Sequence, residues 1–278
     1  MAATIHPTAI VDGSAVLGEG VVIGPHAIVE ADATIGADCE IRAGAVIRRF
    51  TSLGARNFVD SCAVLGGLPQ DAKFDPRVRT DLVIGSGNTF REGVTVSRAT
   101  QPGAPTIIGN DCYFMAGSHA GHDSRLGDHV ILANMAAVGG HAEIGSRAIL
   151  SGGVMVHQFC WVGEMVMSQG HAGASQHVPP CVMLANINFA VGLNVVGLRR
   201  APDVSAAESG QVRLAYRLLY RERLPLREAL QEMDRHTEWT GMAVKFRDFV
   251  RRVAQAQKPH NRGIITERGG RRRAALAE

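Results

Sequence analysis

An apolar residue recurs at every sixth position through most of the first 170 residues of this chain. Eleven such residues stand in register between positions 5 and 65, and a second run in register covers positions 108 to 162. A helix repeats its apolar face every 3.6 residues and a half-buried strand every two, so neither selects one position in six. A short repeat sustained over this length indicates a solenoid.

The simplest solenoid with this period is a triangular coil. Each unit of six supplies a short strand and a corner, so three units make one turn of 18 residues. The apolar residue of each unit points inward and stacks on its counterparts in the turns above and below, about 4.8 Å away. The 32 glycines and the aromatic content of only 5% suit such thin layers. We therefore predict a mainly β coil over residues 1–200.

The repeat is interrupted twice. Residues 66–80 and 98–105 fit no six-residue unit and contain proline, glycine and charged residues. We expect both segments to leave the coil as loops. Loops that interrupt a solenoid commonly carry binding residues.

The sequence changes character after about residue 173, where the repeat fades. Apolar residues at helical spacing begin near Val204, Pro225 stands where a second helix would open, and Thr240 stands where a third would be capped. These signals predict a small helical C-terminal domain over residues 201–257. Residues 258–278 are charged and broken by glycine, so we predict a basic, disordered tail there.

Charge is distributed unevenly along the chain. Residues 1–200 carry 13 Lys and Arg against 16 Asp and Glu, whereas residues 201–278 carry 16 against 10. A basic C-terminal part predicts an acidic partner, and an acidic protein or a phosphorylated substrate fits better than nucleic acid. No aromatic-rich basic motif accompanies the charge, so we expect no nucleic-acid binding.

The five cysteines are scattered and form no CxxC pair. Three of them take the fifth place of a six-residue unit, which predicts small buried side chains: Cys39, Cys112 and Cys160. The first residues lack the basic and apolar regions of a signal peptide, and no segment is long enough to span a bilayer. We expect a reduced, cytoplasmic protein without membrane insertion.

The coil period also predicts which polar residues meet. Residues 18 apart stack on adjacent turns, so His122, Gly140 and Gln158 form one line, and Asp123 and His141 form the line beside it. A neutral His next to an Asp can act as a general base. A glycine one turn away can offer its N–H to an oxyanion.

This combination suits acyl transfer to a hydroxyl or an amine, because the substrate itself attacks once its proton is removed. No metal or organic cofactor is needed. A second hypothesis is that His119, His122 and His141 bind zinc between subunits, but nothing in their spacing demands that the rings converge on one ion. We therefore expect no metal.

Several stretches resemble the hexapeptide acyltransferases and, more narrowly, the UDP-N-acetylglucosamine acyltransferases. The resemblance reaches to about residue 255 and implies a left-handed parallel β-helix that forms a homotrimer. The stretches that carry it include Gln70-Asp71-Ala72-Lys73, Ser118-His119-Ala120-Gly121-His122-Asp123, Gly140-His141, Val156-His157-Gln158-Phe159-Cys160 and Gly192-Leu193-Asn194-Val195-Val196-Gly197-Leu198.

The resemblance implies transfer of a 3-hydroxyacyl chain from acyl carrier protein to the 3-hydroxyl of UDP-N-acetylglucosamine. It gives His122 as the base, Asp123 behind it and the Gly140 N–H as the oxyanion donor. The basic helical domain would dock the carrier protein. The implied substrate contacts are Asp71, Lys73, His119 and His141 around the sugar, His157 and Gln158 along the nucleotide or acyl region, and Asn194 and Arg200 at the acyl donor or the nucleotide phosphates.

Three positions depart from the family pattern. Ser97 and Ile187 stand where the family commonly has basic or imidazole side chains, and one Arg is missing after Arg200. Gly170 lies where the family measures acyl-chain length, and a glycine there leaves room for a longer chain. A related acceptor such as a 3-amino sugar nucleotide is therefore an alternative. From a different class, a metal-dependent hydratase or a non-catalytic solenoid also fits the repeat.

Overall fold

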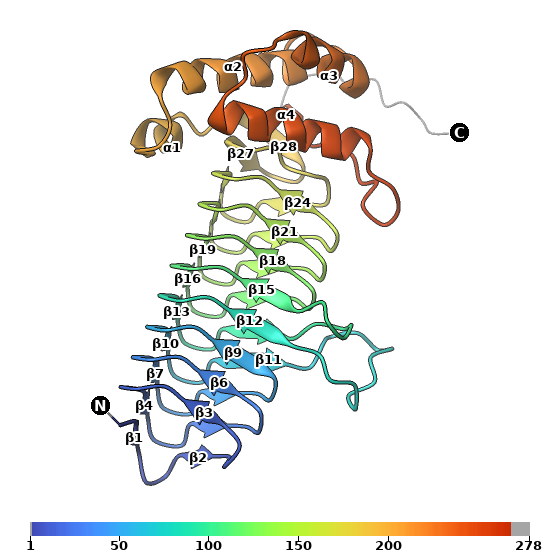
Figure 1. The fold of residues 1–278 in the computed structure, drawn as a ribbon. Helices are drawn as coiled ribbons and strands as arrows, with labels where there is room; N and C mark the ends of the chain where they lie inside the picture. Colours follow the sequence, from blue (N-terminus) through green and yellow to red (C-terminus); the bar gives the residue numbers. More distant parts are fainter. Residues whose placement is uncertain (1, 268–278) are drawn as a thin grey trace.

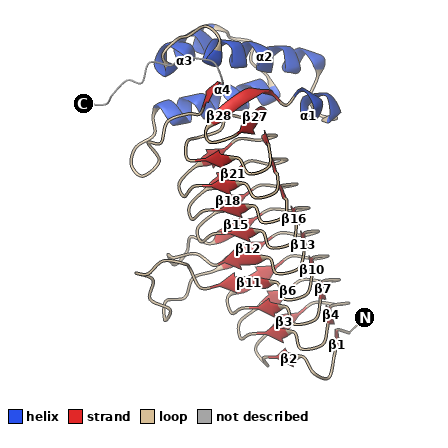
Figure 2. Cartoon of the chain, turned by 180° about the vertical axis from the view of Figure 1, so that it is seen from behind, coloured by secondary structure: helices blue, strands red, loops and turns tan. Residues whose placement is uncertain are grey.

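The computed structural model describes residues 2–267, and the prediction of disorder for 268–278 lies outside the described residues. The chain winds into a triangular coil whose three flat sides are parallel sheets, here called A, B and C (Figures 1 and 2). Strands pair with those one turn away, as in Val22↔Glu40 and Ala137↔Met155. The six-residue period therefore predicted the architecture of the coil correctly.

Sheet A contains the first strand of each turn and extends furthest along the chain. Its strands are β1 (Thr4–Ile5), β4 (Val22–Ile23), β7 (Glu40–Ile41), β10 (Phe58–Val59), β13 (Thr89–Phe90), β16 (Tyr113–Phe114), β19 (Ile131–Leu132), β22 (Ile149–Leu150), β25 (Met167–Ser168), β27 (Val182–Ala185), β28 (Phe189–Leu193) and β29 (Thr266–Glu267).

Sheets B and C form the other two sides. Sheet B comprises β2 (Ile10–Val11), β5 (Ile28–Val29), β8 (Val46–Ile47), β11 (Val64–Gly67), β14 (Thr95–Ser97), β17 (His119–Ala120), β20 (Ala137–Val138), β23 (Met155–Val156) and β26 (Gly173–Ala174). Sheet C comprises β3 (Val16–Leu17), β6 (Thr34–Ile35), β9 (Thr51–Leu53), β12 (Leu82–Ile84), β15 (Thr106–Ile108), β18 (Arg125–Leu126), β21 (Glu143–Ile144) and β24 (Trp161–Val162).

The core of the coil consists of the residues at the repeating apolar position. From Ile23 upward these side chains are almost completely buried, because each lies between its counterparts in the turns below and above. Cys39, Cys112 and Cys160 are buried beside them, as predicted, and all five cysteines are free. Burial of this continuous apolar column is the main stabilising contribution to a fold that has few long-range contacts beyond neighbouring turns.

Both predicted interruptions are loops. The first connects β11 to β12 and the second connects β14 to β15, so both leave the coil at the corner between sheets B and C. They project from the side of the coil in Figure 1. This shared corner is where the polar lines predicted from the 18-residue period also lie.

The regular coil ends earlier than residue 200. After β26 the chain forms an antiparallel hairpin, β27–β28, and then the short helix α1 (Val195–Arg200). Three helices follow across the end of the coil opposite the N-terminus: α2 (Ala206–Tyr220), α3 (Leu226–Arg235) and α4 (Gly241–Ala254). None of the helices in the described chain is long and apolar enough to cross a membrane.

Local signals explain where the three helices begin. Ser205 and Glu208 form a capping box that starts α2, and Pro225 precedes α3 as expected. Thr240 does stand at the N-cap position of α4, but its hydroxyl donates to Gln211 Oε1 instead of capping the helix. The Thr240 hydroxyl thus connects α4 to α2 and does not cap α4.

The prediction of a disordered tail is wrong for residues 258–267. This segment turns back onto the coil, where Ile264 and Ile265 are buried and Thr266 pairs with Phe189 of β28. Its charged, glycine-containing composition suggested disorder, but two adjacent isoleucines and the free edge of β28 provide enough burial and backbone pairing to order it. We call residues 258–267 the C-terminal strap.

Candidate active site

The two predicted lines of polar residues lie on adjacent turns at the corner between sheets B and C. The backbone N–H of His141 donates to the carbonyl of His122 at 2.9 Å, and that of Phe159 donates to the carbonyl of Gly140 at 3.0 Å. Asp123, His141 and Phe159 each take a positive φ near 60° at this corner. The stacking expected from the 18-residue period is therefore confirmed.

His122 and Asp123 form a hydrogen-bonded pair. Nδ1 of His122 lies 2.7 Å from Oδ2 of Asp123. The carboxylate also accepts from the N–H and the hydroxyl of Thr100, at 3.0 and 2.8 Å. A proton on Nδ1 satisfies the carboxylate and leaves Nε2 of His122 with a free lone pair, as a general base requires.

Thr100 was not among the residues singled out from the sequence. It belongs to the loop between β14 and β15, and it reaches Asp123 across 23 residues of sequence. Burial raises the pKa of Asp123, but hydrogen bonds from His122 and Thr100 outweigh that effect and hold the pKa below its ordinary value. The second loop thus keeps the carboxylate ionised and oriented behind His122.

Gly140 lies against the ring of His122. A Cβ built on Gly140 would meet Cε1 of His122 at 2.6 Å, so a side chain at position 140 would displace the imidazole. Within residues 2–267 no acceptor takes the Gly140 N–H. A backbone donor beside the base is the arrangement needed to stabilise an oxyanion.

His141 and His119 flank the pair. Nε2 of His141 lies 3.4 Å from the same Asp123 oxygen, and its ring meets that of His122 edge-on at 5.3 Å between centroids. Nδ1 of His119, on β17, lies 2.7 Å from the hydroxyl of Thr95. Burial lowers the pKa of both His119 and His141, which favours their neutral forms at physiological pH.

A cleft of about 380 Å³ opens beside His122 on the sheet B side of the corner. It contains five of the residues proposed from the sequence, together with Gln70 from the first loop and the buried Ser97. Its lining is Gln70, Ser97, His119, Gly121, His122, Ala137, Val138, Gly139, Gly140, Met155, Val156, His157 and Gln158.

Sheet B continues this cleft as a strip of small and apolar side chains. Ala137, Met155 and Gly173 occupy successive outward positions in register, and Ile187 lies against Gly173 at the top of the strip. Met155 and Ile187 are exposed. The strip offers an apolar path that starts next to His122 and leads toward the helical end of the coil.

The first loop brings Asp71 near the site. Its negative charge is close enough to His141 to oppose the lowering of the His141 pKa. The backbone N–H of Lys73 donates to Asp71 Oδ1 at 2.9 Å. Neither residue lines the cleft of this single chain. Both lie in the loop that also contributes Gln70.

Asn194 and Arg200 lie at the two ends of α1, and neither belongs to the lining of the cleft. Asn194 is buried: its Oδ1 accepts from the N–H of Gly197 at 2.8 Å and its Nδ2 donates to the carbonyl of Met165 at 3.0 Å. Within one chain, Asn194 is thus a helix cap, and Arg200 is exposed.

His122, Asp123 and His141 also form the one group of described residues whose ligand atoms lie within 4.8 Å of one another. The zinc hypothesis named His119 together with His122 and His141, but in the structure the third member of the group is Asp123. The atoms that would bind an ion are nevertheless those that form the His122–Asp123 hydrogen bond, and Oδ2 of Asp123 also accepts from Thr100. A metal would have to break this network, so the geometry fits a base with its orienting carboxylate better.

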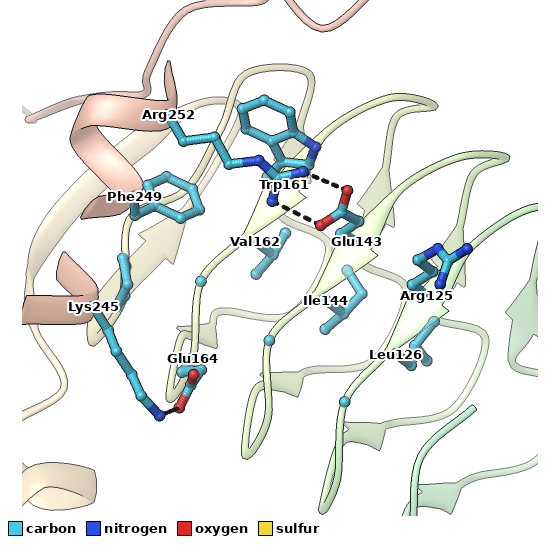
Figure 3. Close-up of a pocket in the computed structure, with 14 residues that line it drawn as sticks. Arg125, Leu126, Glu143, Ile144, Trp161, Val162, Glu164, Lys245, Phe249 and Arg252 are labelled. Atoms are coloured by element: carbon cyan, nitrogen blue, oxygen red, sulfur yellow. Dashed lines mark hydrogen bonds and ion pairs between the residues drawn. The ribbon is translucent and has the colours of Figure 1, made fainter. Parts of the chain in front are cut away.

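A second cleft, of about 330 Å³, lies between sheet C and α4 (Figure 3). Arg252 makes two hydrogen bonds to Glu143, at 2.7 and 2.6 Å, and its guanidinium lies 3.6 Å from the ring centroid of Trp161. Lys245 pairs with Glu164 at 2.8 Å. These two ion pairs connect α4 to the sheet C side of the coil.

A third cleft, of about 460 Å³, is lined by three arginines. Arg213, Arg217 and Arg221 follow one face of α2 at four-residue spacing, next to Leu193 and Val195 at the end of the hairpin. No carboxylate lines this cleft, although Arg217 and Arg221 each have an acidic neighbour beyond it. We call it the basic groove.

Two family patterns match the sequence. The pattern described as "Udp N-acetylglucosamine O-acyltransferase; Domain 2" covers residues 178–265, and the bacterial transferase hexapeptide pattern covers 14–49 and 105–140. Among curated proteins, an acyl-[acyl-carrier-protein]--UDP-N-acetylglucosamine O-acyltransferase from an Anaeromyxobacter species is 43% identical over 91% of this chain and 98% of its own length. One from Burkholderia orbicola is 48% identical over 81% and 86%.

Solved structures show the same similarity. A UDP-N-acetylglucosamine acyltransferase from Bacteroides fragilis superposes with a TM-score of 0.85 at 32% identity and covers 94% of this chain and 100% of that one. LpxA from Acinetobacter baumannii gives a TM-score of 0.86 at 33% identity, with 94% and 99% covered. The coil is thus a left-handed parallel β-helix, as expected.

Proposed function

This chain belongs to the UDP-N-acetylglucosamine O-acyltransferase family, and we propose that it performs the reaction for which its relatives are named. It moves a 3-hydroxyacyl chain from acyl carrier protein to the 3-hydroxyl of UDP-N-acetylglucosamine, the first step of lipid A biosynthesis. The observation that carries this proposal at the site is the His122–Asp123 pair beside the Gly140 N–H, which no acceptor takes within residues 2–267.

The chemistry follows from that pair. Nε2 of His122 removes the proton of the sugar 3-hydroxyl as its oxygen attacks the thioester carbonyl carbon. The carbonyl oxygen takes the negative charge and accepts from the Gly140 N–H. When the intermediate collapses, the C–S bond breaks and the leaving thiolate receives the proton from the imidazolium. Asp123 stabilises the imidazolium while it exists, and the chain needs no cofactor beyond the donor's own thioester.

We assign the remaining residues by the resemblance and by their places in or near the cleft. His119, His141 and the first-loop residues Asp71 and Lys73 would contact the sugar. His157 and Gln158 line the cleft one turn above Gly140, next to the nucleotide or the start of the acyl chain. The apolar strip above Ala137 suits the acyl chain itself.

Outward side chains support a homotrimer. Sheet A presents Ile131, Ile149 and Met167 in register, and sheet B presents apolar residues below the cleft, whereas sheet C presents Arg125 and Glu143 at the same height. An apolar stretch on sheet A, an apolar stretch on sheet B and a charged stretch on sheet C suit a ring in which sheet A of one copy packs on sheet B of the next. Asn194 and Arg200 would reach donor or nucleotide only from a neighbouring copy.

The basic groove is the surface that we propose for the carrier protein. Three arginines on one face of α2 offer an acidic protein a row of cations, with apolar residues beside them.

The five free cysteines fit a reduced compartment, and we propose that the enzyme works in the cytoplasm.

A 3-amino sugar nucleotide is the alternative acceptor. Ser97 lines the cleft with a buried side chain, whereas Ile187 is exposed and lies outside the lining, so only Ser97 is placed to change the acceptor pocket. An acceptor with a 3-amino group would be attacked through the same base. A hydratase or a scaffold would use neither the Gly140 N–H nor a thioester.

The test is a competition assay with a mixed set of 3-hydroxyacyl carrier proteins and two acceptors, UDP-N-acetylglucosamine and its 3-amino analogue. We expect the product on the 3-hydroxyl, and its mass gives the chain length. Product only on the amine would shift the assignment to the analogue. No product on either, together with one metal ion per chain whose loss follows His122→Ala, would favour the hydratase.

A further inference from the structure

An unbroken series of ring contacts leads from the base to the C-terminal strap. His122 meets His141 edge-on, His141 stacks on Phe159 with centroids 4.6 Å apart, and Phe159 meets His260 edge-on at 5.6 Å. His260 in turn stacks on Trp161 at 5.0 Å. His260 is thus separated from the base by only two rings, although it lies 138 positions later in the sequence.

The strap is held firmly where His260 meets the coil. Nε2 of His177 lies 2.7 Å from the carbonyl of His260, and the N–H and carbonyl of His177 bond to Gly263 and Ile265 at 2.9 and 3.0 Å. Beyond these contacts the strap pairs with β28. A segment fixed at several points can restrain the side chains on which it rests.

Phe159 is the side chain that the strap restrains. It is only half-buried, and the coil alone offers it the His141 ring on one side. The strap supplies the edge of His260, a contact of 3.1 Å from His260 Nδ1 to the carbonyl of Phe159, and the guanidinium of Arg262 at 6.0 Å from the ring centroid. Without the strap the Phe159 ring would lose these contacts, keep its stacking on His141 and gain rotamer freedom.

We propose that His260 is a positioning residue for the acyl transfer, because it fixes Phe159 and thereby holds His141 in place beside the His122–Asp123 pair. This inference rests on the proposed function. His141 shares the Asp123 oxygen with His122, so a shift of its ring changes both the carboxylate's hydrogen bonding and the space beside the base. A displacement of under about 1 Å at such a position is enough to reduce turnover severalfold or more.

The experiment compares three substitutions at one position. His260→Ala removes the ring, His260→Gln keeps a polar side chain without a ring, and His260→Phe keeps a ring without the hydrogen bond. We expect kcat/KM to fall about tenfold in the first two and to return to within about twofold of wild type in His260→Phe. His236→Ala, which changes an exposed histidine whose ring contacts Trp239, is the matched control and should leave the rate unchanged.

Two results would overturn the proposal: His260→Ala with more than half of the wild-type kcat/KM, or His260→Gln as active as His260→Phe. A crystal structure of His260→Ala provides a readout that needs no activity. It should show the Phe159 ring in a new rotamer and His141 displaced, and an unchanged pair of rings would also contradict the proposal. If the wild-type protein transferred no acyl group, the function would be wrong, and the crystal structure would still decide the role of His260.

Discussion

The imidazole of His122 occupies the space that a Cβ on Gly140 would need, with Cε1 of the ring 2.6 Å from the ideal Cβ position. The two residues are 18 apart in sequence and lie on adjacent turns of the coil. Their closeness places the backbone N–H of residue 140 beside the base. It also makes glycine the only residue at position 140 that leaves the ring where it is.

Gly140→Ala therefore has a definite expected cost. The added methyl must push the imidazole away from its place, and we expect kcat/KM to fall by about 100-fold while the protein stays folded. Gly13→Ala is the control, because a Cβ at Gly13 meets nothing within 4 Å. Steady-state kinetics with both variants checks the prediction, and a Gly140→Ala enzyme with a third or more of wild-type activity would contradict it.

His122→Ala should abolish nearly all turnover without loss of the assembly. Removing a general base costs about 10³-fold in rate. Asp123 keeps its hydrogen bonds from Thr100, so we expect the melting temperature and the oligomeric state to change little. Activity within a few-fold of wild type would remove His122 from the role of base. His6→Ala, at an exposed position near the N-terminus, controls for the loss of any histidine.

Arg217→Glu should weaken the donor and leave the acceptor unaffected. The substitution reverses one charge in the middle of the basic groove, and we expect the KM for acyl carrier protein to rise about tenfold at low salt and less at high salt. Arg227→Glu makes the same charge change on α3, away from the groove. Equal effects of the two substitutions would show that only net charge matters and that the groove is not the docking surface.

The stability of the protein should fall between pH 6.5 and pH 4 through His177. Burial lowers the pKa of this imidazole to about 4, whereas an exposed histidine titrates near 6.5. Below pH 6.5 the unfolded chain binds a proton that the folded chain does not, so the free energy of unfolding decreases as the pH falls. The loss should reach on the order of 2 kcal/mol near pH 4.5.

Urea unfolding of wild type and His177→Gln across this range measures that contribution. The variant should be less stable than wild type at pH 7. Because glutamine does not titrate, its free energy of unfolding should fall less steeply with decreasing pH, with a slope that corresponds to nearly one bound proton fewer. The same slope in both proteins would mean that other groups cause the decline.

Arg252 and Glu143 should couple across the boundary between α4 and the coil. The two hydrogen bonds between them are short, at 2.7 and 2.6 Å, but both side chains are partly exposed. We therefore expect a coupling energy of about 1 kcal/mol in a double-mutant cycle of Arg252→Met and Glu143→Gln. Arg252→Met should cost more than Glu143→Gln, because it also removes the contact with Trp161. Unfolding measurements on the four proteins give the energies, and a coupling below about 0.3 kcal/mol would contradict the prediction.

The amino-acid sequence by itself determined the coil and the stacking of the site. A strict six-residue period leaves one way to bury its apolar residues, and a turn of 18 residues then places His122 beside Gly140 and Asp123 beside His141. These relations are local in the repeat, so counting residues was enough to find them.

Only the tertiary structure decided the contacts that the period does not govern. Thr100 reaches Asp123 from inside a loop, and a loop has no register from which its path could be read. Asn194 caps a helix with the side chain that resemblance to a family had assigned to a substrate. His260 returns to the coil in a segment whose composition indicated disorder. In each case a few specific contacts, made between residues far apart in sequence, outweighed the average preference of the local sequence, and such contacts exist only once the chain has folded.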